Sequence, residues 1–230
     1  MTKRLENISF EHDGVGYELG FGLDEVQKLA NLSKARQGRV THAEFIKIAL
    51  SKYSDRVYIS DDKAEEIRQL FLGGIETEDD KLTYDELIGY LYALSIQAID
   101  DAAKEVEPAI VKINEDSTVN LTIGNEKYKL MFTREQVVEA LEQDVFDNVG
   151  MLDLFATGST LIQMALEHYN KRFSAKRHEE IFLSLWATKF NEETEDDLIE
   201  VIHALNFHMK EVVSSGIKKS KAAFKVTKKK

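Results

Sequence analysis

The segment Tyr128-Lys-Leu-Met-Phe-Thr-Arg-Glu-Gln-Val137 joins the pattern of a strand to the start of a helix. Apolar side chains recur at every second position from Tyr128 to Phe132, which predicts a strand with one buried face. The spacing then changes, and Thr133 precedes Gln136 by three residues, as in a capping box at a helix N-terminus. We therefore predict a strand that ends near residue 132 and a helix that begins near residue 134.

A segment of the same design, Tyr17-Glu-Leu-Gly-Phe-Gly-Leu-Asp-Glu-Val26, lies 111 residues earlier. Each segment follows a dipeptide that suits a two-residue hairpin loop, Asp13-Gly14 in the first copy and Gly124-Asn125 in the second. We therefore predict β-hairpins over residues 6–21 and 118–132.

The match continues downstream, where Phe45 to Tyr53 resembles Leu161 to Tyr169 and Glu65-Glu-Ile67 resembles Glu179-Glu-Ile181. Capping patterns, such as Thr41 with Glu44, mark several helix starts. Helices are predicted near 23–33, 42–53, 61–73 and 84–105, and again near 134–143, 150–170, 175–190 and 195–213. The fold class is mainly α (α+β), with two tandem copies of a β-hairpin followed by a compact helical bundle.

The single proline, Pro108, lies between the copies and marks a domain boundary. We expect a first repeat domain over 1–107, a second over 108–215 and a disordered lysine-rich tail over 216–230. The tail holds seven lysines and no acidic residue, so removing its +7 from the net charge of −11 leaves −18 on the two domains. An acidic body of this kind repels nucleic acid and anionic membrane surfaces.

Composition limits the class of protein further. With 43% hydrophobic and 31% charged residues the chain is typical of soluble globular proteins, and no apolar run approaches the ~20 residues of a membrane span. The start of the chain does not have the pattern of a signal peptide. The absence of cysteine excludes disulfides and thiol catalysis, and agrees with a cytoplasmic location.

The sequence gives no sign of a catalytic site. None of the six histidines lies four residues from another, as a helical metal pair requires, and no phosphate loop or nucleophile elbow is present. Ser33 to Glu44 and Ile75 to Glu86 have the length of EF-hand calcium loops, but their first positions lack carboxylates. We therefore expect no enzyme activity, no cofactor and no metal, and interpret both windows as capped helix starts.

Apolar residues in the last two predicted helices exceed what a single buried face requires. Two interpretations stay open. Either these helices are buried on two sides within the domain, or their extra apolar residues form a surface for a partner or a second copy of the chain. The candidate partner-binding residues are Phe182, Trp186, Phe190, Ile199, Phe207 and Val213, together with Lys218, Lys219 and Lys221 of the tail.

The order of these elements resembles that of the tail assembly chaperones of long-tailed bacteriophages. It consists of a hairpin that ends in Tyr-x-Leu-x-Phe, then a capped helix, then an all-helical remainder. The second copy is similar to the single-domain members over about residues 118–213. The resemblance implies a non-enzymatic protein of the bacterial host cytoplasm that coats the helical, aggregation-prone tape measure protein. Members of this family act before the tail-tube subunits assemble and are absent from the mature virion. The tandem arrangement departs from the usual single domain.

Two other functions stay open at this point. A calcium-independent adaptor with degenerate EF-hand-like helix pairs would bind a partner helix in a groove. Nucleic-acid binding through the tail is the weakest alternative, because Phe224 is the only aromatic residue there. The tape measure protein is the expected partner, with the tail-tube protein and a second copy of the chain as further candidates.

Overall fold

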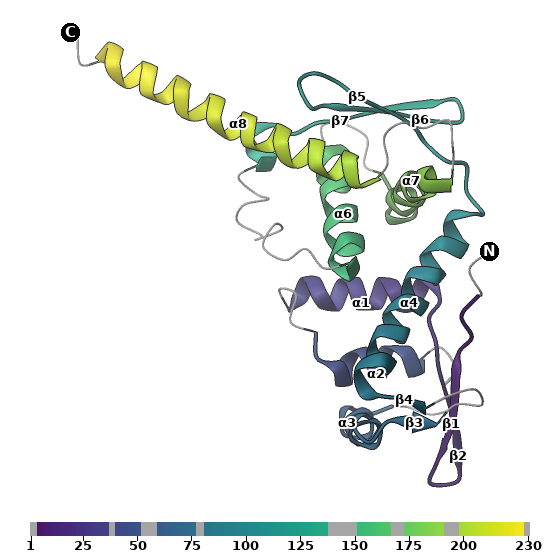
Figure 1. Cartoon of the computed structure of the whole chain (residues 1–230). Helices are drawn as coiled ribbons and strands as arrows, with labels where there is room; N and C mark the ends of the chain where they lie inside the picture. Colours follow the sequence, from purple (N-terminus) through teal and green to yellow (C-terminus); the bar gives the residue numbers. More distant parts are fainter. Residues whose placement is uncertain are drawn as a thin grey trace. The chain divides into compact units, whose positions relative to one another are not determined.

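The computed structural model describes residues 4–36, 40–51, 59–76, 81–137, 151–166, 173–190 and 198–227 (Figure 1). The chain is mainly helical and carries small antiparallel sheets. It divides into two compact units, residues 1–102 with 150–156 and residues 103–149 with 157–230. The sequence had led us to expect a boundary at residue 107, and it gave no reason to group residues 150–156 with the first unit.

The first unit begins with a two-stranded antiparallel hairpin, as predicted. Asp13 and Gly14 both have positive φ, 52° and 71°, which a type I′ turn requires at its two central residues. The elements of this unit are β1 (Ile8–His12), β2 (Val15–Leu19), α1 (Leu23–Ala35), α2 (His42–Ser51), α3 (Asp61–Phe71), β3 (Ile75–Glu76), β4 (Lys81–Leu82) and α4 (Tyr84–Ala103). The short β3–β4 pair was not predicted.

The second unit contains a three-stranded sheet in the order β5-β6-β7, of which only the β6–β7 hairpin was predicted. Its added strand lies just after Pro108, in a stretch that we had interpreted only as a boundary. The elements are β5 (Ile110–Ile113), β6 (Val119–Ile123), β7 (Glu126–Leu130), α6 (Met151–Leu166), α7 (Ala175–Trp186), the 3-10 helix η1 (Ala187–Phe190) and α8 (Leu198–Thr227). Residues 151–156 at the start of α6 group with the first unit, and residues 157–166 with the second. Residues 134–137 are helical, and the rest of the predicted helix 134–143 lies outside the described residues.

The two hairpins have the same register. Ile8 pairs with Leu19 and Phe10 with Tyr17, and the residues 111 positions later pair in the same way, Val119 with Leu130 and Leu121 with Tyr128. Seven of these eight apolar side chains are buried, and Phe10 is half-buried. The predicted alternation therefore places the same positions of each hairpin against a core.

Each hairpin is also tied to a later helix by an equivalent main-chain hydrogen bond. The amide of Gly20 donates to the carbonyl of Ala49 at 3.1 Å, and the amide of Met131 donates to the carbonyl of Ala165 at 3.2 Å. The next helix starts alike in both units: Ser60 caps α3 and Ser174 caps α7, each accepting from the amide three residues later. These contacts fix where the sheet meets the helices in each unit.

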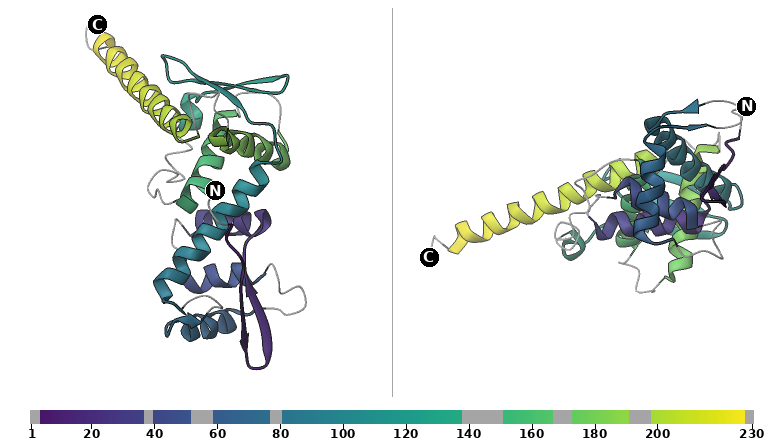
Figure 2. Two further views of the ribbon diagram at one scale, coloured as in Figure 1. Left: turned by 45° about the vertical axis from the view of Figure 1, so that its right-hand side comes forward. Right: turned by 90° about the horizontal axis from the view of Figure 1, so that it is seen from below.

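The C-terminal region differs from the prediction. The sequence indicated a disordered tail from residue 216, whereas α8 continues as a helix to Thr227. In both views of Figure 2 its C-terminal part extends beyond the other elements of its unit. Residues 216–227 contain no proline and only one glycine, so nothing in their composition forces the helix to end earlier.

Candidate partner-binding surface

Two of the predicted partner-binding residues belong to the core. Phe182 and Trp186, on α7, are only 1% and 6% exposed, and their rings lie 5.9 Å apart. Gly158 lets α6 pack closely on Phe182 and Ile202. A Cβ at this position would lie 3.4 Å from the Phe182 ring and 3.0 Å from Cδ1 of Ile202. The second half of α7, residues 181–186, is nearly apolar all round and is buried at every position, whereas the polar residues 176–180 are exposed or half-buried. Both residues are therefore removed from the candidate surface.

Three of the predicted residues are exposed. Ile199 and Phe207 on α8 are 50% and 55% exposed, and Phe190 at the end of η1 is 47% exposed. On an α-helix, residues 199, 203 and 207 follow one another at 40° steps, so Ile199, His203 and Phe207 form a single stripe. His203 is exposed as well. We call Ile199, His203 and Phe207 the outer stripe of α8.

The opposite side of α8 holds the helix in place. Its buried apolar residues are Leu198, Val201, Ile202, Ala204, Leu205 and Met209. His208, at one margin of this buried side, stacks against Phe132 and contacts the Asp116 carbonyl through Nδ1 at 3.0 Å. The buried side anchors α8, and about half of each of the Ile199 and Phe207 side chains stays exposed to solvent.

The other four predicted residues contribute little to the candidate partner-binding surface. Val213 on α8 is half-buried. Lys218, Lys219 and Lys221 belong to the helical continuation of α8, but their side chains lie outside the part of the chain whose side chains are described. They therefore contribute no geometry to the candidate surface.

Basic side chains surround Phe190. The Lys189 ammonium lies 4.9 Å from the centroid of the Phe190 ring and 4.7 Å from that of Trp186, and the Lys104 ammonium lies 5.8 Å from the Phe190 ring. These are cation–π distances. Phe190 therefore offers an apolar ring bordered by positive charge.

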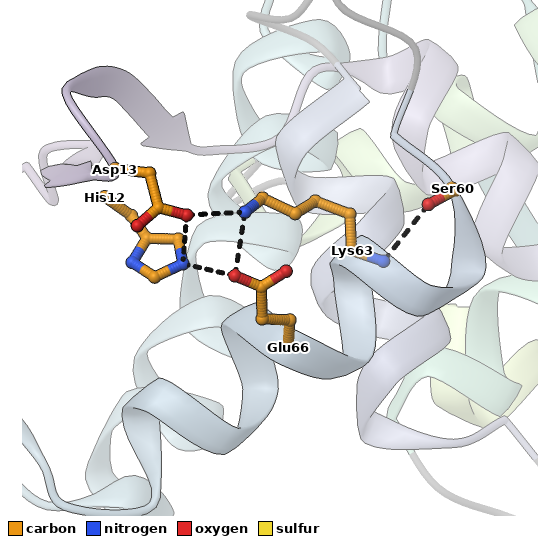
Figure 3. Close-up of polar contacts among 5 residues, drawn as sticks. All are labelled: His12, Asp13, Ser60, Lys63 and Glu66. Carbon is orange, nitrogen blue, oxygen red and sulfur yellow. Dashed lines mark hydrogen bonds and ion pairs between the residues drawn. The ribbon is translucent and has the colours of Figure 1, made fainter.

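A charged cluster in the first unit ties the turn of the β1–β2 hairpin to α3, and Figure 3 shows its members facing one another. Lys63 Nζ lies 3.3 Å from an Asp13 oxygen and 2.9 Å from a Glu66 oxygen, and His12 Nε2 lies 2.6 Å from the same Glu66 oxygen. Hydrogen bonds from His12 and Lys63 lower the pKa of the Glu66 carboxyl. We call His12, Asp13, Lys63 and Glu66 the hairpin clasp.

The hairpin clasp also contains a set of potential metal ligands that sequence reasoning missed, because its parts lie more than 50 residues apart. One ligand atom each from His12, Asp13 and Glu66 lies within 4.8 Å of the others. The Lys63 ammonium already bonds to both carboxylates, so positive charge is supplied from within the chain. A metal ion would have to displace this ammonium, and the cluster is better described as an ion-pair network.

The second unit has a related network between its sheet and α7. Arg177 pairs with Glu180 at 2.8 Å and also contacts Glu126 and the Tyr128 hydroxyl. Arg177 and Glu180 lie 114 residues after Lys63 and Glu66, so the two networks use equivalent helix positions. Burial is the main cause that raises the pKa of the Tyr128 hydroxyl, and the bond to Glu180 is the main cause that raises the pKa of Arg177.

The closing glutamates of the two calcium-loop windows are engaged in capping boxes, as predicted. Glu44 accepts from the amide and hydroxyl of Thr41, both at 2.9 Å, and pairs with Arg36 at 2.8 Å. Glu86 accepts from the amide and hydroxyl of Thr83 at 2.8 and 2.7 Å. The Thr backbone amide is the main cause that lowers the pKa of each carboxyl. Residues 37–39 and 77–80 of the windows lie outside the described residues.

Comparison with protein-family models, with curated proteins and with solved structures found no match for this chain. A search for membrane-spanning helices over the described residues found none of sufficient length and apolar character.

Proposed function

We propose that the chain is a duplicated hairpin-and-helix domain that works by binding a helical protein partner. The equivalent hairpin registers, the paired bonds from Gly20 to Ala49 and from Met131 to Ala165, and the caps at Ser60 and Ser174 support the duplication. The two main-chain bonds join residues 29 and 34 positions apart, so a chance match of short local patterns would not reproduce them.

Within this class, we propose a tail assembly chaperone of a long-tailed bacteriophage, which keeps the helical tape measure protein soluble until tail-tube subunits assemble around it. The observation that carries the proposal is the outer stripe of α8, where Ile199 and Phe207 remain half exposed on a helix anchored by its other side. An anchored helix with exposed apolar side chains can pack against an amphipathic partner helix. The net charge of −11 would keep the complex soluble.

Co-expression with a helical fragment of the tape measure protein from the same genome tests this proposal. We expect wild-type protein to hold the fragment in the soluble fraction and to co-purify with it. Phe207→Asp and Ile199→Asp should each reduce the recovered fragment at least ~10-fold, because a carboxylate buried against an apolar partner loses its hydration. The melting temperature of each variant should stay close to that of wild type, since both positions are exposed.

Leu70→Asp is the matched control, because Leu70 on α3 is 45% exposed and lies in the first unit, away from α8 in the chain. It should leave recovery of the fragment unchanged. Equal loss with all three variants, or full recovery with Phe207→Asp, would refute a role for the outer stripe. Equal binding of an unrelated amphipathic helix would instead favour the adaptor function.

A further inference from the structure

Among the described residues, no strand covers the outer edge of β1, whereas the corresponding edge in the second unit is covered. Residues that flank a two-residue hairpin loop form a hydrogen-bonded pair, so His12, Phe10 and Ile8 bond to β2. The backbone groups of Ser9 and Glu11 therefore point away from β2. In the described part of the chain β1 pairs with β2 alone, and both Ser9 and Glu11 are exposed.

The second unit shows how such an edge is covered. Asn120 and Thr122 of β6 are the equivalents of Ser9 and Glu11, 111 residues later, and β5 pairs with them through Lys112 and Ile110. Between these pairs Val111 lies next to Leu121 and is buried. A strand in the same place on β1 would bring an apolar side chain next to Phe10, which is only half-buried.

The outer face of the β1–β2 hairpin indicates the charge of such a strand. An open hollow of about 500 Å³ on the hairpin is lined by Ser9, Phe10, Glu11, Gly16, Tyr17 and Glu18. Its charged side chains, Glu11 and Glu18, are both acidic. A strand that alternates apolar and basic residues would place its basic side chains over these carboxylates and its apolar ones beside Ile8 and Phe10.

We propose that the β1 edge binds an extended segment of a partner protein with alternating apolar and basic residues, which extends the hairpin to three strands in the manner of β5. The main-chain groups of Ser9 and Glu11 supply the hydrogen bonds, and Glu11 and Glu18 select basic side chains. A second copy of β1 fits less well, because it would bring another Glu11 and Glu18 to an already acidic face. The inference concerns the first unit and does not depend on the function proposed above.

The test uses the full-length protein and a fluorescently labelled, end-capped peptide of residues 109–114, the β5 strand with its Lys112. We expect saturable binding by fluorescence anisotropy, with slower amide exchange at Ser9 and Glu11. Exchange at Asn120 and Thr122 should not change, because tethered β5 already covers that edge. Absence of saturable binding at millimolar peptide would overturn the proposal.

Two proline variants locate the site. Ser9→Pro removes an outward amide of β1 and should weaken binding at least ~10-fold, while proline at an outward position of an edge strand leaves the bonds to β2 intact. Lys127→Pro is the matched control in the second unit, where β7 is an edge strand and the exposed Lys127 is the cross-strand partner of Thr122.

The control variant should bind as wild type does. Equal weakening by both variants, or none by Ser9→Pro, would contradict the assignment to β1. Sedimentation of the protein without peptide completes the test, and we expect the same mass for wild type and Ser9→Pro. A dimer that Ser9→Pro abolishes would mean that a second copy fills the edge, which also overturns the proposal.

Discussion

The two hairpins are alike on the side that faces a core and different on the side that faces solvent. Tyr17 and Leu19 have the equivalents Tyr128 and Leu130, and all four are buried. On the outer side, Glu18 is replaced by Lys129 and Gly16 by Lys127, so an acidic face becomes a basic one. Packing therefore restricts the inner positions, whereas the outer positions are free to acquire different partners.

The largest expected effects concern the inner side. Leu19→Ala and Leu130→Ala each delete a fully buried side chain, so each should lower the free energy of unfolding of its own unit by ~2–5 kcal/mol. Native-state hydrogen exchange measures the units separately, through the amide of Gly20 for the first and that of Met131 for the second. If the two hairpins are equivalent, the two losses should be similar.

Leu70→Ala provides the control for these core substitutions, because this α3 side chain is 45% exposed. Its effect should stay within ~0.5 kcal/mol. A loss at Leu19 that is several-fold smaller than the loss at Leu130 would show that the hairpins have equivalent registers without equivalent roles.

The next largest effect on stability is expected from the capping box at the start of the helix that follows β7. The Thr133 hydroxyl accepts from the backbone amide of Gln136, and Oε1 of Gln136 accepts from the backbone amide of Thr133 at 2.7 Å. Thr133→Ala should therefore cost ~1 kcal/mol in the second unit, measured by exchange at Met131. Thr133→Gly installs the residue found 111 positions earlier, Gly22 of the first unit, and should cost only about a few tenths of a kcal/mol. A glycine variant as unstable as the alanine variant would show that the hydroxyl itself is needed.

The features that depend on local patterns were predicted, and those that depend on distant partners were not. Alternation, turn dipeptides and capping boxes lie within a few residues of one another, and they gave both hairpins and the helix starts. Whether Phe182 and Phe207 were buried or exposed could not be predicted, because apolar residues on several sides of a helix do not show which side meets a neighbour. The hairpin clasp was missed for a related reason, since His12 meets Glu66 only after the hairpin packs on α3.

β5 illustrates a different limit. Four residues with two exposed side chains give a weak strand pattern, and strand pairing depends on the neighbouring β6. The exposed Ile110 and Lys112 make the segment resemble a linker, particularly after Pro108. The segment is a strand because it pairs with β6, where Ile110 lies opposite Thr122 and Lys112 opposite Asn120.

A smaller effect on stability is expected where α6 packs on α8, and it distinguishes the two units. Gly158 lies in the middle of α6, close to Ile202. The residue 116 positions earlier, His42, is exposed and contacts the Tyr84 hydroxyl at 2.9 Å. In an open helix Gly→Ala is favourable by ~1 kcal/mol. At Gly158 the new Cβ would lie 3.0 Å from Ile202 Cδ1, so the gain should be largely lost.

Ile202→Val removes that Cδ1 atom, and Gly158→Ala should therefore be more favourable in the Ile202→Val background than in wild type. We expect a coupling of at least ~0.5 kcal/mol in the double-mutant cycle, measured by exchange at Met131. Additive effects would mean that the Ile202 side chain moves aside without cost.

The smallest effect concerns pH and the hairpin clasp. Bonds from His12 and Lys63 lower the pKa of Glu66 from its ordinary value of 4.5, so the carboxylate stabilises the folded state at neutral pH. This contribution is present above the unfolded-state pKa and is lost as the pH falls from about 4.5 through the lowered folded-state value. Glu66→Gln should therefore be less stable than wild type to urea at pH 7, and the difference should shrink as the pH falls below 4.5. Glu11→Gln removes an equal charge from the exposed edge of the same hairpin, and its difference from wild type should change less with pH. A Glu66→Gln difference that stays constant from pH 7 to pH 3 would show that the clasp contributes through packing and not through the charge of Glu66.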